Sequence, residues 1–144
     1  MLFASAKSAA RRLLLMLTLL SAGCNAPMPS LNLEPEVNKL FSSLQAKDVN
    51  LALTFYSEDF YKGIPRQMWE LRLRQFLDFM GPIDSFRITN RQADTRYSGK
   101  FFVFQLDTLH AGDKKARHIV TYILPIDGST VKLVAHKITA KGFE

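Results

Sequence analysis

The stretch KFFVFQLDTLH, residues 100–110, is the most β-prone segment of the chain and decides the fold. Aromatic and β-branched side chains such as these favour strands. We expect Phe102 and Phe104 to face the interior. Because side chains alternate along a strand, Thr108 and His110 then lie on the same side. The segment is therefore predicted to be a strand that presents one face to the core.

Three further segments have the same β-prone character, and short turn-like sequences separate them. In chain order the pattern is strand 85–92, turn 97–99, strand 100–110, turn 111–113, strand 118–124, turn 125–128 and strand 131–138. Parallel strands need long crossovers, so short turns predict an antiparallel meander. Within the first strand, Phe86 and Ile88 are expected on one face, and Arg87 and Arg91 on the other.

The sequence before these strands has helical periodicity. Helices are predicted over residues 35–44, 49–56 and 65–80, the last ending at a Gly-Pro pair. Trp69 lies on the apolar stripe of the third helix and is expected beneath Phe102, Phe104 and Tyr122. Helices followed by strands indicate an α+β domain, with N-terminal helices packed on a four-stranded antiparallel meander sheet.

The N-terminal residues have the pattern of an export signal. Residues 1–12 contain Lys7, Arg11 and Arg12 but no acid, and an apolar block follows at 13–20. A basic segment, a short apolar segment and small residues describe a secretory signal peptide. We therefore divide the chain into a signal peptide at 1–23, a tether at 24–30 and one domain at 31–144.

The end of this signal, LSAGC at residues 20–24, resembles the lipobox of bacterial lipoproteins. It departs from that pattern at Ser21, where the family usually has Leu. The resemblance implies that Cys24 is acylated and that membrane lipid holds the mature protein. Asn25 resembles the sorting pattern for the outer membrane, which implies the periplasmic face of that membrane if the organism is Gram-negative. Two or more acyl chains anchor a protein stably.

The charge balance changes once the signal is removed. The whole chain has 19 Lys and Arg against 13 Asp and Glu, and three of the basic residues precede residue 24. The mature chain therefore has 16 basic and 13 acidic residues, a net charge of +3. With this balance and with export, nucleic acid is excluded as a partner. The more basic residues 61–144 would suit anionic headgroups or an acidic partner.

Two short motifs in the helical half carry a family resemblance. LQAKDV at 44–49 and YSEDF at 56–60 resemble the start of a nuclear-transport-factor-2-like domain, also called SnoaL-like or cystatin-like. The resemblance implies a cone-like (cystatin-like) fold with a pocket between sheet and helices. Members of this family include isomerases, dehydratases and non-enzymatic binding modules, so the fold alone does not give the function.

The sequence has few residues that point to catalysis. It lacks a Gly-x-Ser-x-Gly elbow, a Gly-x-Gly-x-x-Gly loop and a P-loop, and Cys24 is its only cysteine. His110, His118 and His136 are 8 and 18 residues apart, which is not a zinc-ligand spacing. We expect His110 and His118 to be partly exposed residues near a strand end. Neither metal, cofactor nor catalytic residue is assigned.

A pocket between the predicted sheet and helices would have an apolar lining and a few polar groups. The candidate pocket residues are Trp69, Phe104, Thr108, His118 and Tyr122. The alternative is that they are ordinary core residues with polar tips at the rim. No inward-facing acid is evident, which counts against the acid–base chemistry of the isomerases.

These observations predict a lipid-anchored protein of the cell envelope that acts as a non-enzymatic binding or interaction module. Its partner would be an envelope protein. A further possibility is a second copy of the chain, bound through the outer sheet face, where Ile119, Thr121 and Ile123 would be exposed. The alternative is a small SnoaL-like isomerase or dehydratase using His118 and Tyr122 in an apolar pocket.

Overall fold

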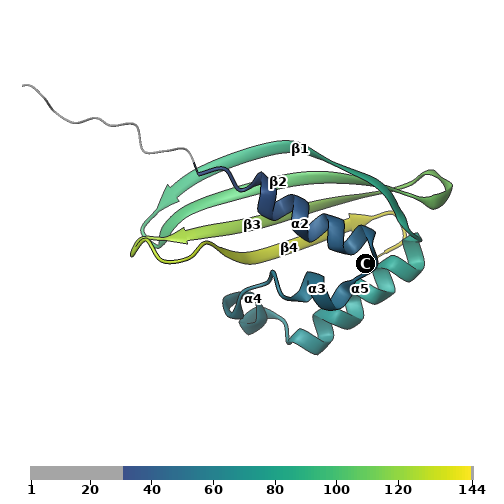
Figure 1. Ribbon diagram of the computed structural model, residues 1–144, viewed down its shortest axis with the longest axis horizontal. Coiled ribbons are helices and arrows are strands. Elements are labelled where there is room, and N and C mark those ends of the chain that lie inside the picture. The colour runs from purple at the N-terminus through teal and green to yellow at the C-terminus, as the bar shows by residue number, and fades with distance from the viewer. Residues whose placement is uncertain (1–30, 144) are drawn as a thin grey trace, which may run out of the picture. The chain divides into compact units, whose positions relative to one another are not determined.

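The computed structural model describes residues 31–143 (Figure 1). The described residues from Leu33 onward form one compact unit. The predicted signal peptide, Cys24 and the tether lie outside the described residues. No helix within residues 31–143 is both long and apolar enough to cross a membrane.

Helices precede strands throughout the described part of the chain, as the periodicity predicts. The helices are α2 (Glu34–Gln45), α3 (Val49–Leu53), α4 (Glu58–Gly63) and α5 (Arg66–Met80). The strands are β1 (Ile83–Arg96), β2 (Gly99–His110), β3 (Lys114–Pro125) and β4 (Lys132–Ala140), with a short 3₁₀ turn at Ala111–Asp113. The sheet order β1-β2-β3-β4 is antiparallel throughout. The predicted α+β fold with a four-stranded meander is confirmed.

Two of the helices begin at a side chain that caps a free backbone group, and α5 ends at a glycine. The Asp48 side chain accepts a hydrogen bond from the backbone of α3, and Ser57 does the same for α4. Gly81, at φ +83°, ends α5 and donates its N–H to Leu77 O at 2.9 Å. The predicted helix 49–56 is wrong in its length, because α3 stops at Leu53 and a separate helix, α4, follows.

The sheet is irregular in its first strand. Ile88 pairs with Leu106 and Asn90 with Gln105, so Thr89 is an extra residue that reverses the alternation beyond it. Arg91 consequently lies on the helix side of the sheet, where its Nε is 2.6 Å from the carboxylate of Glu34. The prediction that Arg87 and Arg91 share a face is wrong for this reason.

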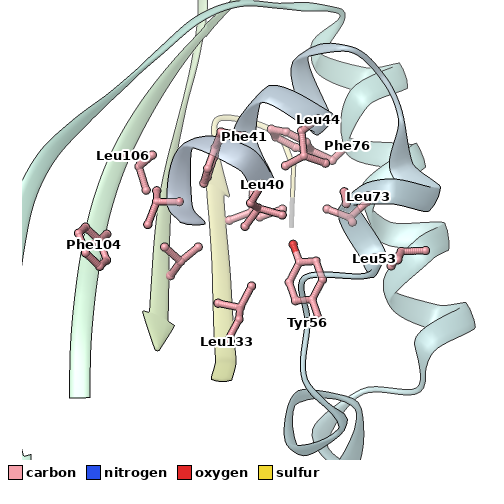
Figure 2. Close-up of a cluster of buried hydrophobic side chains, with 14 of the residues drawn as sticks. Leu40, Phe41, Leu44, Leu53, Tyr56, Leu73, Phe76, Phe104, Leu106 and Leu133 are labelled. Carbon is pink, nitrogen blue, oxygen red and sulfur yellow. The ribbon is translucent and has the colours of Figure 1, made fainter. Parts of the chain in front are cut away.

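The core lies between the helices and one face of the sheet (Figure 2). Leu40, Phe41 and Leu44 of α2 sit between the sheet and α5, whose Leu73 and Phe76 point toward them. In Figure 1, α2 lies over the strands, and α4 lies beside β4. Alternate residues of β2 are buried, from Phe102 to His110.

Trp69 takes a different place from the one the sequence predicts. Its indole packs against Tyr56, Phe60 and His136, with ring centroids 5.6, 5.1 and 5.4 Å apart. Among the described residues none of its ring contacts is with Phe102, Phe104 or Tyr122. The prediction fails because the N-terminal half of α5 packs near α4 and β4 and away from the Phe-rich part of β2.

Candidate functional site: a buried chain of three histidines

Five polar side chains meet inside the apolar core. They come from the α3–α4 connection and from three strands: Tyr56, Thr108, His110, His118 and His136. Thr108, His110 and His118 are at most 1% exposed, Tyr56 is 5% exposed and His136 9%. The strand register brings them together, because β3 pairs with β2 on one side and with β4 on the other.

Hydrogen bonds join these five side chains end to end, and we call them the histidine chain. The Tyr56 hydroxyl is 2.7 Å from His136 Nδ1, and His136 Nε2 is 3.0 Å from His118 Nδ1. His118 Nε2 is 3.2 Å from Thr108 Oγ1, which is 2.9 Å from His110 Nε2. His110 Nδ1 lies 2.9 Å from the carbonyl oxygen of Gly81, at the end of α5.

The carbonyl of Gly81 fixes the direction of every bond in the histidine chain. A carbonyl only accepts, so His110 Nδ1–H donates to it, and neutral His110 must accept at Nε2. Thr108 Oγ1 is 2.9 Å from that nitrogen and 3.4 Å from Ala116 O, so its single proton goes to the nitrogen, and His118 Nε2–H donates to the hydroxyl oxygen. Then His136 donates to His118. Finally, the Tyr56 hydroxyl donates to His136.

Burial keeps all three imidazoles neutral. It lowers the pKa of His136 to about 3 and that of His118 well below its usual value, to which the neighbouring histidines also contribute. The pKa of His110 is lowered by burial as well, although its bond to Gly81 opposes the shift. Burial also raises the pKa of Tyr56. With every member neutral, one set of tautomers satisfies all the bonds.

Aromatic rings enclose the histidine chain. Phe41 and His118 form a T-shaped pair with ring centroids 5.0 Å apart, and Phe76 forms such pairs with both His110 and His118 at 5.3 Å. Tyr56 lies nearly parallel to His136, at an angle of 11°. These contacts place the imidazoles among core side chains, where an unpaired polar atom would be costly. A proton can pass along such a chain only if every tautomer in it reverses.

The structure unites some of the predicted pocket residues and separates others. Thr108 and His118 are hydrogen-bonded to each other. Phe104 and Tyr122 instead form an edge pair at 6.1 Å. Among the described residues, the Tyr122 hydroxyl and the Trp69 Nε1 are buried polar atoms without a hydrogen-bond partner. Burial raises the pKa of Tyr122.

The sequence prediction for the histidines needs correction. His110 and His118 are fully buried, not partly exposed, because both face the helices. The alternation of side chains along β2 already predicted that His110 lies on the same side of the sheet as Phe102. His136 and Tyr56 were missed. The signal for His136 is hidden by an irregularity between Thr121 and Tyr122 in the β3–β4 pairing, which breaks the alternation of β4. No group of three or more His, Cys, Asp or Glu within residues 31–143 has the arrangement of a metal site.

The opposite face of the sheet has a shallow hollow of about 160 Å³. It is lined by Asn90, Gln92, Val103, Gln105 and Ile119. Three of these side chains are carboxamides and two are aliphatic, so the hollow is uncharged. The predicted contact residues Ile119, Thr121 and Ile123 are partly exposed on this face.

The domain thus belongs to the α+β class, with helices on one face of an antiparallel meander and a neutral polar chain within its core. Its fold resembles that of Bdellovibrio bacteriovorus Bd1075, with a TM-score of 0.52 and 12% identity. The match covers 75% of this chain and only 39% of that chain. An NTF2-like protein from Cytophaga hutchinsonii gives a TM-score of 0.49 and 14% identity, covering 76% of this chain and 99% of that one. No family model and no curated protein matches the chain.

Proposed function

We propose that the chain is an exported lipoprotein, held at a membrane by acylated Cys24, whose domain is a non-enzymatic binding module of the cell envelope. The lipobox-like residues 20–24 and the basic and apolar segments before them support export and acylation. Asn25 supports the periplasmic face of the outer membrane if the organism is Gram-negative.

The observation that favours a binding module over an enzyme is that the side chains of the histidine chain satisfy one another's hydrogen bonds. Each donor and acceptor of its imidazoles already has a partner, and it contains no carboxylate. A general acid or base must reach a proton of its substrate within hydrogen-bond distance. Here the ionisable groups are occupied by one another and buried. The histidine chain is therefore assigned to holding the three strands and α5 together.

The alternative, an isomerase using His118 and Tyr122, has less support. Both side chains face the helices, but His118 binds Thr108 and His136, whereas Tyr122 packs its ring against Phe104. The two share no hydrogen bond. An acid–base pair acting on one substrate would need its two groups to converge on the same reacting atoms.

The outer face of the sheet is the better candidate for binding. The carboxamides of Gln92 and Gln105 can donate to and accept from peptide groups, and Val103 and Ile119 supply apolar contact. Such a mixture suits a protein partner, either another envelope protein or a second copy.

Acylation is tested by intact-mass spectrometry of the mature protein from its native host. We expect cleavage before Cys24, a mass increase equal to the attached acyl groups and recovery in the membrane fraction. A Cys24→Ser variant should lose both the added mass and the membrane association. An unmodified Cys24 in a correctly processed chain would contradict the proposal.

Binding through the outer face is tested by placing a photo-crosslinking amino acid at Val103 in living cells. A discrete adduct is expected there and not at Tyr97, which is fully exposed in the β1–β2 turn. Gln105→Arg should abolish the adduct because it puts an unpaired charge into the uncharged hollow. The adduct mass separates a second copy from another protein. Equal adducts at both positions would contradict the assignment of this face.

A further inference from the structure

Helix α5 has a second apolar stripe that the fold does not bury. Its core-facing side contains Trp69, Leu73, Phe76, Leu77 and Met80. On the other side, Met68, Leu71 and Phe79 are 55%, 48% and 45% exposed. At 3.6 residues per turn these three fall on one face together with Arg72 and Gln75. We call Met68, Leu71, Arg72, Gln75 and Phe79 the α5 stripe.

Cations lie directly against the aromatic residues at one end of the α5 stripe. Lys114 Nζ is 5.6 Å from the ring centroid of Phe79 and donates to its backbone oxygen at 2.9 Å. The guanidinium of Arg72 lies 5.3 Å from the ring of Phe143, which in turn contacts Phe79 at 5.9 Å. Neither Arg72 nor Lys114 forms an ion pair within residues 31–143.

The acidic residues of α5 lie on its other flank. Glu70 is engaged by Arg74 at 2.8 Å, and Asp78 is exposed beside Leu71 on the helical wheel. The stripe therefore presents apolar and aromatic side chains with positive charge along the Arg72 and Lys114 side. Apolar side chains next to such cations match the interface of an anionic bilayer, where apolar groups enter the acyl boundary and cations reach the phosphates.

We propose that the α5 stripe lies on an anionic lipid surface, so that the domain docks on the bilayer that anchors it. The proposal rests on the acylation of Cys24 proposed above, because acylation would hold the domain close to the membrane. The nine Cα-to-Cα steps from Cys24 to Leu33 span at most about 32 Å when fully extended, which keeps the domain near that bilayer. Docking leaves the outer sheet face free for a partner, since the stripe belongs to the helical side.

The test uses the mature chain with Cys24→Ser, so that no acyl group contributes to binding. Within residues 31–143 the core runs from Leu33 to Phe143, and this chain retains all of it. Flotation with vesicles of phosphatidylethanolamine and phosphatidylglycerol should recover the protein, and vesicles of phosphatidylcholine alone should not. The recovery should fall as salt is added, because salt screens the attraction to anionic headgroups.

Substitutions in the stripe identify the contact surface. Arg72→Gln and Lys114→Gln should each weaken vesicle binding about 5-fold, corresponding to about 1 kcal/mol per cation near the surface. Leu71→Ser should weaken it further by removing apolar contact. The matched controls are Ile126→Ser, which changes a side chain that is 79% exposed, and Arg96→Gln in the β1–β2 region. The fluorescence of Trp69 reports whether each variant is folded.

The outcomes separate this proposal from the lipoprotein assignment. Absence of binding by the Cys24→Ser chain, with acylated protein still found in membranes, overturns the docking and leaves the anchor standing. Binding by the Cys24→Ser chain, with an unmodified Cys24 in the host, supports the docking and contradicts the anchor. Equal losses in the stripe and control variants overturn the docking. A dimer in solution that Leu71→Ser dissociates would assign the stripe to a second copy and also overturn it.

Discussion

Mild acid should destabilise this domain strongly, because its only three histidines are all in the histidine chain. The pKa of His136 falls from 6.5 to about 3 on folding, owing to burial. Between these values the unfolded chain binds a proton that the folded chain does not. The stability that His136 contributes is therefore complete above pH 6.5 and is lost as the pH falls toward 3.

The size of this loss of stability follows from the linkage between proton binding and unfolding. At pH 5 the unfolded state gains about 2 kcal/mol from protonating His136, while at pH 7.5 the gain is about 0.1 kcal/mol. The pKa values of His118 and His110 are also lowered, so both add to the loss in the same direction. The upper limit for three imidazoles that stay neutral is about 6 kcal/mol at pH 5. That is comparable to the whole stability of many domains.

Urea unfolding followed by the fluorescence of Trp69, the only tryptophan, measures this loss between pH 7.5 and 5. The matched variant is His136→Gln, whose amide can donate toward His118 and accept from the Tyr56 hydroxyl but does not titrate. This variant should reduce the slope of the unfolding free energy against pH by the contribution of one bound proton. A flat stability profile for the natural chain, or an unchanged slope in the variant, would refute the argument.

Two further predictions concern single positions. Thr108→Val keeps the side-chain shape but leaves the His110 acceptor and the His118 donor without a partner, so it should cost about 2–4 kcal/mol. Exposed Thr139→Val, the control, should change the melting temperature little; equal effects would contradict the role of the hydroxyl. Gly99→Ala places a Cβ 2.2 Å from Leu124 O at φ +145° and should lower the melting temperature by several degrees. Gly63→Ala, whose Cβ meets nothing within 4 Å, should not, and a similar loss there would disprove the steric explanation.

The parts of the fold that the sequence predicts are those with strong local patterns. Helix α5 has its apolar spacing, and β2 has its dense aromatic alternation. Helix α4 was missed because it is only six residues long and follows directly on Tyr56, which pairs with the distant Leu133. Short helices owe little to intrinsic propensity, so their stability comes from tertiary contacts that local periodicity does not record.

The candidate site was only half predictable for a similar reason. Thr108 and His118 followed from alternation along regular strands. The bulge at Thr89 changed the side of Arg91, and the irregular pairing of β4 concealed His136. A single extra residue moves every later side chain to the other face, and sequence alone does not place that residue.

By itself the sequence determined that helices precede the strands, that the sheet is an antiparallel meander and that the chain starts with an export-signal pattern, because spacing, turns and charge order are properties of neighbouring residues. Only the tertiary structure decided that Tyr56 and His136, 80 positions apart, lie 2.7 Å from each other. It also determined that the carbonyl at the end of α5 sets the tautomer of every histidine. Hydrogen bonds depend on distance and direction in space, and these exist only once register and packing have brought the strands and helices together.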